Sequence, residues 1–291
     1  MKNEIRGIAT ADLATIVAGL VREDIAFHVE FVREGEFAFC HSYSPLVVSY
    51  GMGVDSTAML LGMQQRRMRP DLILFADTGS EKPETYAYLE HINAWLDSVQ
   101  FPRVTVVKNH SPKAGYRSLE EQLLTLRVLP PLAYRKHQCS LVWKRDPQHR
   151  FIKEEFPQAR DAWARGQTVI TCIGYDAGAQ DRDRATKSLG KESPGFTNRF
   201  LLQDWGWDRD RCKAEIAAAG LPLPVKSACF FCPAMKKDEV TALHAKHPQL
   251  AARSLEIERL AQQRGLKTIK GLGIQWTWQR HLNFQLTSAA G

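Results

Sequence analysis

The sequence contains no run of about 18 consecutive apolar residues, the length that a membrane-spanning helix needs. It also lacks the uninterrupted apolar stretch of an export signal, because acidic side chains occur near its start. We therefore expect a cytoplasmic protein without a membrane partner. Of its 291 residues 44% are hydrophobic and 24% charged, which is enough apolar material for a sizeable core. This composition excludes disordered, collagen-like and small disulfide-stabilised proteins.

Charge and cysteine content narrow the class further. Basic residues outnumber acidic ones, 39 to 32, and the formal net charge of +7 suits polyanionic partners such as nucleotides or nucleic acid. Six cysteines in a chain without an export signal indicate a reducing compartment. There, thiols pack in the core, bind metals or carry out redox chemistry.

Apolar β-type runs alternate with helical stretches along most of the chain. We predict strands at 44–50, 72–77, 104–107, 168–175 and 200–202, and helices at 54–68, 83–98, 208–219 and 236–264. Continuous Val/Ile/Leu runs that alternate with helices are typical of a parallel sheet covered on both faces. The predicted fold class is therefore α/β, with a mostly parallel twisted sheet and helices on both faces.

Three regions are expected. Residues 1–43 predict a small N-terminal α+β cap, with a helix at 11–21 and a hairpin; residues 44–235 form the core, and residues 236–291 a C-terminal helical extension. Within the core, the polar segment 176–198 is interpreted as a mobile loop that orders when a ligand binds.

A glycine-rich turn follows the first core strand. It contains Gly51 and Gly53, and Ser56 and Thr57 add hydroxyl groups to the first turn of the next helix. Free amides at a helix start and close backbone approach at glycine suit a phosphate or pyrophosphate. The turn lacks the lysine of a Walker A loop, and Ser56 stands where a dinucleotide fingerprint needs a third glycine.

What remains resembles the SGGxDS signature of the ATP pyrophosphatase (PP-loop) superfamily, with residues 53–56 at its centre. A second segment, DTGSEKPET at 77–85, resembles the phosphoadenosine phosphosulfate (PAPS) reductase-like branch of that superfamily. Its Pro83 and Glu84 also suit an ordinary helix start. Further similar segments are 173–176 with Arg182 and Arg184, 201–205, 220–222 and 229–233. The resemblance thus spans about 45–235 and implies an adenine nucleotide alpha hydrolase-like fold, although Tyr175 replaces the arginine usual after Gly174.

Three cysteines form the second candidate site. Cys229 and Cys232 make a CxxC motif, and Cys139 lies far upstream, next to a serine. A CxxC turn can bring two sulfurs to one metal centre. The resemblance implies a [4Fe–4S] cluster with one open iron, as in cluster-dependent tRNA thiolation enzymes; a zinc site completed by His137 or His149 and unligated thiols stay open as alternatives. Cys40, Cys172 and Cys212 are interpreted as packing residues.

No cysteine follows Cys232. PAPS and APS reductases use a cysteine near the C-terminus as the nucleophile, so this lack disfavours reduction of a sulfonucleotide.

The resemblance implies an ATP-dependent adenylating enzyme that uses Mg²⁺ and acts as a sulfurtransferase on nucleic acid (tRNA or DNA) or a nucleotide, with a sulfur-donor protein as partner. A PAPS/APS reductase-like enzyme and a non-catalytic nucleotide-binding protein are the alternatives. Asp55, Ser56 and Lys144 are the expected catalytic residues, and Cys139, Cys229 and Cys232 the expected metal ligands. The expected nucleotide-binding residues are Ser49, Gly51, Gly53, Val54, Ser56, Thr57, Asp77, Thr78, Gly79, Gly174, Arg182 and Arg184.

Overall fold

The computed structural model describes residues 4–9, 12, 15, 17, 27–33, 36–41, 43–109 and 115–289. Its centre is a five-stranded parallel sheet in the order β6-β5-β4-β7-β8. The strands are β4 (Leu46–Ser49), β5 (Leu72–Asp77), β6 (Val104–Lys108), β7 (Val169–Ile173) and β8 (Phe196–Arg199). The predicted α/β class with a parallel sheet is therefore confirmed.

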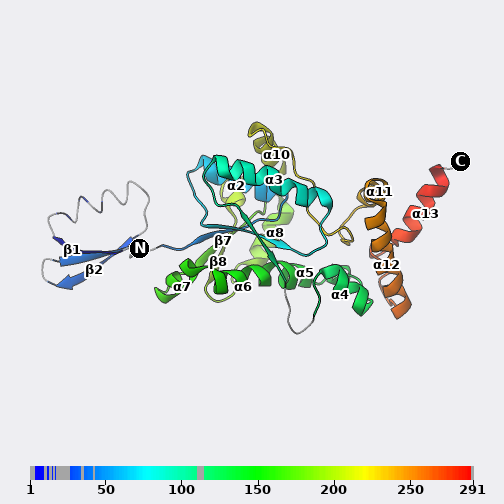
Figure 1. Cartoon of the computed structure of the whole chain (residues 1–291), viewed down its shortest axis with the longest axis horizontal. Helices are drawn as coiled ribbons and strands as arrows, with labels where there is room; N and C mark the ends of the chain where they lie inside the picture. Colours follow the sequence, from blue (N-terminus) through cyan, green and yellow to red (C-terminus); the bar gives the residue numbers. More distant parts are fainter. Residues whose placement is uncertain are drawn as a thin grey trace.

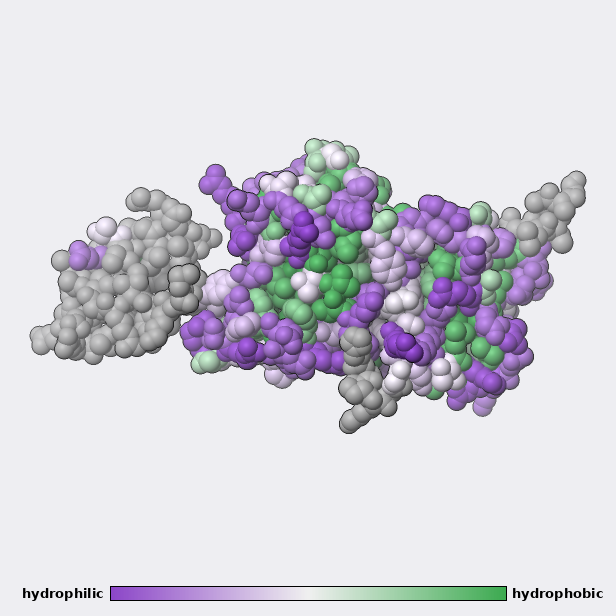
Figure 2. Space-filling model, viewed as in Figure 1, coloured by the Kyte–Doolittle hydropathy of each residue, from purple (hydrophilic) through white to green (hydrophobic). Residues whose placement is uncertain are grey.

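Helices cover both faces of this sheet (Figure 1). One face packs against α2 (Val54–Gln65), α3 (Pro83–Ser98), α9 (Leu201–Asp204) and α10 (Arg209–Ala218), and the other against α6 (Asp146–Glu155) and α7 (Pro157–Ala164). Neighbouring strand residues point to opposite faces, so Val48 and Ile73 join the first layer while Val47 and Leu72 join the second. Figure 2 shows apolar residues between more hydrophilic ones on the viewed face of this core.

The C-terminal helices share a second hydrophobic cluster with earlier parts of the chain. These helices are α11 (Lys237–Lys246), α12 (Pro248–Arg264) and α13 (Trp278–Ala289), and they pack with α4 (Leu119–Leu126) and with the aromatic pair inside the CxxC motif. The buried carboxylate of Glu258 organises this unit, because it accepts hydrogen bonds from the backbone amides of Leu272, Trp278 and Gln279 at 2.7–3.0 Å.

A separate antiparallel sheet precedes the core. It consists of β1 (Glu4–Ala9), β2 (Phe27–Arg33) and β3 (Glu36–His41) in the order β1-β3-β2, so the predicted pairing of the two alternating stretches is confirmed. Most of the helix predicted at 11–21 lies outside the described residues.

Three predicted elements differ in the structure. Residues 200–202 are not a strand: β8 ends at Arg199, and Leu201 and Leu202 begin the short helix α9. The apolar run there is too short for its pattern to distinguish a strand from a helix. The segment 176–198 contains helix α8 (Ala179–Ser188) and the start of β8 rather than a long loop. The helix predicted at 236–264 is interrupted at His247, because a residue before proline disfavours helical backbone.

Shorter turns complete the chain between α4 and α6. They are the 3₁₀ turn Pro131–Tyr134, α5 (Gln138–Ser140) and a π-helical turn, Leu141–Arg145. Within the described part of the chain, no helix is long and apolar enough to span a bilayer.

His149 on α6 provides a test of how α6 packs against the sheet. Its ring stacks on Phe196 with centroids 3.9 Å apart, and burial, helped by Arg145 and Lys153, lowers its pKa from 6.5 to about 4. Because the folded state keeps the His149 ring neutral, the free energy of unfolding falls as pH drops from about 6.5 through 4. We expect the free energy of unfolding in urea to fall by roughly 1–2 kcal/mol across this window, after allowance for solvent screening. His149→Phe should flatten the slope; equal slopes for both chains would contradict this packing.

Candidate functional site

The phosphate loop joins β4 to α2, as predicted. Gly53 has extended backbone and caps the helix, and the amide of Thr57 donates the first intrahelical bond to the Gly53 carbonyl at 3.0 Å. The amides of Val54, Asp55 and Ser56 precede that bond, so the helix itself gives them no acceptor. Such a helix start attracts an anion through its amides and its dipole.

The hydroxyl groups of Ser56 and Thr57 form hydrogen bonds within the protein. Ser56 Oγ accepts from the Gly53 amide at 3.3 Å and lies 3.2 Å from the Gly53 carbonyl, which it can donate to. Thr57 is fully buried, and its hydroxyl bonds the Tyr50 hydroxyl at 2.9 Å. These groups shape the loop, so a phosphate at this position would be held chiefly by backbone amides. Ser49 ends β4, and Gly51 is exposed at the mouth of the loop.

Gly174 lies directly against the start of α2. A Cβ at Gly174 would be 2.8 Å from both the backbone N and the Cα of Ser56, a distance that real Cβ contacts do not reach. Glycine is therefore required where the end of β7 meets the phosphate loop. The next residue, Tyr175, stacks parallel to Phe200 with ring centroids 5.5 Å apart, so an aromatic pair borders the loop here.

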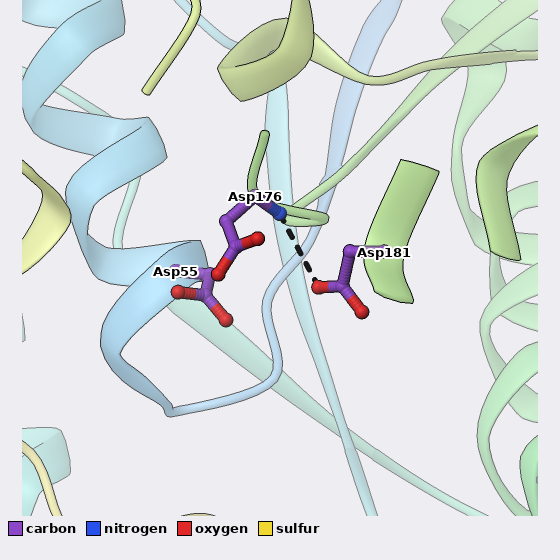
Figure 3. Close-up of side chains that lie close together, drawn as sticks. All are labelled: Asp55, Asp176 and Asp181. Atoms are coloured by element: carbon purple, nitrogen blue, oxygen red, sulfur yellow. Dashed lines mark hydrogen bonds between the residues drawn. The ribbon is translucent and has the colours of Figure 1, made fainter. Parts of the chain in front are cut away.

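Three carboxylates meet beside the helix start (Figure 3). Asp55 comes from the first turn of α2, Asp176 from the loop after β7, and Asp181 from α8; one oxygen of each lies within 4.8 Å of the others. Asp181 accepts a hydrogen bond from the Asp176 amide at 3.3 Å. Among the described residues, this is the group whose spacing suits a metal ion.

The environment of Asp55 fits a cation. Its Oδ2 pairs with Arg209 at 2.5 Å, while its Oδ1 is buried and has no hydrogen-bond partner. Burial raises the pKa of Asp55, Arg209 opposes this, and the neighbouring carboxylates Asp176 and Asp181 raise it further. Mg²⁺ prefers oxygen ligands such as carboxylates, and a buried carboxylate oxygen without a partner calls for one. These three side chains would hold Mg²⁺, which would neutralise charge on a bound polyphosphate.

Hydrogen bonds between nearby residues stabilise the segment after β5. Asp77 accepts from the Gly79 amide and from the Tyr86 hydroxyl, each at 2.7 Å, and its other oxygen lies 3.4 Å from Lys108. Gly79 has a φ of +69°, and a Cβ there would be 2.8 Å from Ser118. Asp77 and Gly79 therefore hold the turn in place, whatever contact they also make with a nucleotide.

Helix α8 carries the two arginines that the sequence predicted to bind nucleotide. Arg184 pairs with Asp181 at 2.8 Å, and both Arg182 and Arg184 are exposed on the helix that follows the loop. Their contact with a nucleotide stays a prediction.

The CxxC motif forms a tight turn beside Thr78, in the segment after β5. The amide of Cys232 donates to the carbonyl of Cys229 at 2.9 Å, and Cys229 Sγ lies 3.2 Å from the Thr78 hydroxyl. Cys139, on α5, packs against the same hydrophobic cluster as the motif. The structure thus brings the three predicted cysteines to one part of the molecule.

All three cysteines are partly buried, and none is crosslinked. Burial, followed by Glu81, raises the pKa of Cys229 to about 12, and burial also raises the pKa values of Cys139 and Cys232. The three sulfurs are not all within 4.8 Å of one another. Sulfurs around one tetrahedral zinc lie roughly 3.8 Å apart, given Zn–S bonds of about 2.3 Å, so zinc would require the cysteines to draw together. His149 stacks on Phe196 instead of joining them.

Several residues of the site were not identified from the sequence. Asp176 and Asp181 complete the carboxylate group, Arg209 pairs with Asp55, and Glu81 and Ser227 lie between the loop and the cysteines. Two of them had a local signal: Asp176 follows a strand end and Gly174, and Glu81 lies in the segment 77–85. The others come from helix starts and loops whose meeting depends on tertiary packing.

Residues 45–167 match the family model described as the phosphoadenosine phosphosulfate reductase domain. The matched range covers the phosphate loop, the segment 77–85 and Cys139, and ends before β7 and the CxxC motif. No curated protein matches the chain.

Proposed function

The chain carries a phosphoadenosine phosphosulfate reductase-like domain of the adenine nucleotide alpha hydrolase superfamily, and from this premise we propose that it is an ATP-dependent adenylating enzyme. The domain supports a nucleotide-binding enzyme. The choice of ATP, and of sulfur transfer as the second half of the reaction, is our proposal.

The observation that carries this proposal is that groups that attract an anion and groups that attract a cation lie side by side at the start of α2. Free amides there attract an anion, but Asp55, Asp176 and Asp181 stand next to them and repel one. A polyphosphate bound together with a divalent cation satisfies both groups. A triphosphate with Mg²⁺ therefore suits the site better than a sulfonucleotide that arrives without a metal.

In the proposed reaction, the amides of residues 54–56 bind the β- and γ-phosphates, and a substrate oxygen attacks the α-phosphorus. An oxygen–phosphorus bond forms to the substrate, and pyrophosphate leaves with the electrons of the broken bond. Fixed amide dipoles stabilise the charge that develops on the leaving group. A sulfur nucleophile then bonds to the activated carbon, and AMP departs with the bonding pair.

The cysteines would serve the second half of the reaction. Three thiolates can hold an iron–sulfur cluster, whose separate iron atoms accept sulfurs spread more widely than one zinc ion does. Thiols whose pKa values are raised by burial do not ionise readily at neutral pH, so a metal is the group that would deprotonate them. Five uncrosslinked cysteines among the described residues agree with a reducing, cytoplasmic setting.

The acceptor in this proposal is nucleic acid or a nucleotide, and a sulfur-donor protein completes the set of partners. Exposed basic residues near Cys139 (Arg135, Lys136 and Arg145) and the net charge of +7 support a polyanionic acceptor. The alternative is a sulfonucleotide reductase, which the match of residues 45–167 favours.

Calorimetric titration of the full chain separates these functions. ATP, adenosine phosphosulfate and phosphoadenosine phosphosulfate are each titrated with Mg²⁺ and with a chelator, and pyrophosphate release is measured beside them. We expect ATP to bind most tightly, only with Mg²⁺, and candidate RNA or DNA acceptors to promote pyrophosphate release. Tighter, metal-independent binding of a sulfonucleotide would contradict the proposal, and so would ATP binding that never leads to pyrophosphate release.

A charge-matched pair of variants tests the metal site. Asp181→Asn keeps an oxygen for the Asp176 amide but removes one carboxylate from the group, whereas Asp183→Asn removes an exposed carboxylate two residues away that pairs with Lys187. We expect Asp181→Asn to weaken Mg²⁺-dependent ATP binding by about tenfold or more. Asp183→Asn should bind as the parent does. Equal losses in both variants would point to general electrostatics rather than a metal site.

A further inference from the structure

Glu81 lies between the phosphate loop and the cysteines. Its side chain is fully buried, in the segment 77–85 that resembles the PAPS reductase-like branch. One carboxylate oxygen pairs with the Lys144 ammonium at 3.4 Å, and the other accepts from the Ser227 hydroxyl at 3.3 Å. A buried carboxylate is costly unless it is paired, so these two contacts must be maintained for the fold to tolerate it.

Each contact of Glu81 leads toward a different part of the site. Ser227 lies against the phosphate loop, since a Cβ on Gly53 would be 3.9 Å from Ser227 Cβ. On the other side, Glu81 forms a bridge pair with Cys229, and the amide of Phe230 donates to the Ser80 carbonyl at 2.9 Å. The segment around Glu81 is therefore the backbone support of the CxxC turn.

Lys144 reaches Glu81 from the π-helical turn Leu141–Arg145. Such turns are rare and often occur at functional sites, because they redirect a side chain at a cost in hydrogen bonding. Burial lowers the pKa of Lys144, but Glu81 and the thiols of the CxxC motif together raise it by more. The pKa of Lys144 therefore lies above its usual value. The ammonium is therefore charged, and it is paired with Glu81, the residue that forms a bridge pair with Cys229.

We propose that Glu81 is a positioning residue that holds the Lys144 ammonium between the phosphate loop and the cysteines. Without the carboxylate, the partly exposed lysine side chain gains a lower-cost position in solvent. The consequence for catalysis rests on the proposed function: a cation fixed here would face the adenylated substrate's phosphate while AMP is displaced. The placement of Lys144 itself can be measured without any nucleotide.

The experiment compares alkylation of Cys232 by iodoacetate, which is anionic, and by iodoacetamide, which is neutral. Both reagents need the thiolate, so their rate ratio reports local charge and not the thiolate fraction. The full chain is reduced, freed of metal with a chelator, checked for folding by circular dichroism, and mapped by mass spectrometry. Cys232 is the reporter because Lys144 influences it more than Glu81 does, whereas the reverse holds for Cys229.

Three variants interpret the ratio. Lys144→Gln removes the cation and defines the low value, which we expect to be about twofold or more below the parent at low salt. Glu81→Gln should fall to the same value. Glu120→Gln, which removes another buried carboxylate whose backbone contacts Ser80, should keep the parent ratio even if it lowers stability.

The opposite outcomes overturn the proposal. If Lys144 stays in place without Glu81, loss of the negative charge makes the surroundings of Cys232 more positive, and the ratio in Glu81→Gln rises above the parent. An unchanged ratio in Glu81→Gln, or a parent ratio equal to that of Lys144→Gln, also contradicts it. Failure of the ATP titration would leave this result untouched, so the two proposals fail separately.

Discussion

The contact between Gly174 and the backbone of Ser56 determines how the site is built. It presses the end of β7 onto the first turn of α2 so closely that a Cβ would be 2.8 Å from the helix backbone. Because parallel strands β4 and β7 are neighbours, their carboxyl ends open at the same edge of the sheet. The loop after β7 therefore brings Asp176, and α8 brings Asp181, next to Asp55. A larger residue at this junction would separate the carboxylates from the amides.

The site combines charges that do not satisfy each other. Amides at the start of α2 favour an anion, while three carboxylates within 4.8 Å of one another favour a cation, and one oxygen of Asp55 is left buried and unpaired. Arg209 compensates only part of this charge. A metal-bound polyphosphate completes the arrangement. On the other side of the loop, Ser227, Glu81 and Lys144 form a connected path to the CxxC turn.

The parts that depend on local sequence were predictable. Apolar runs indicated β4, β5, β6 and β7, and the glycine-rich turn with Asp55 indicated the phosphate loop, because both signals lie within a few consecutive residues. Glu81 and Asp181 could not be assigned, since their roles come from contacts across 63 and 126 positions of the chain respectively, set by tertiary packing. The helix α8 was missed because its ten residues are polar and lack an apolar face that periodicity can detect. The roles of the three cysteines stay predictions.

The most direct test of the account is the affinity of Gly53→Ala for ATP with Mg²⁺, measured by calorimetry beside its thermal stability. Gly53 has extended backbone with φ −116°, and an added Cβ meets nothing closer than 3.9 Å, so the free protein should tolerate alanine with an unchanged melting temperature. We expect ATP affinity to fall by about tenfold or more, because the methyl group keeps a phosphate from the amides of α2. Unchanged affinity in a stable Gly53→Ala chain would show that the nucleotide does not bind at this helix start.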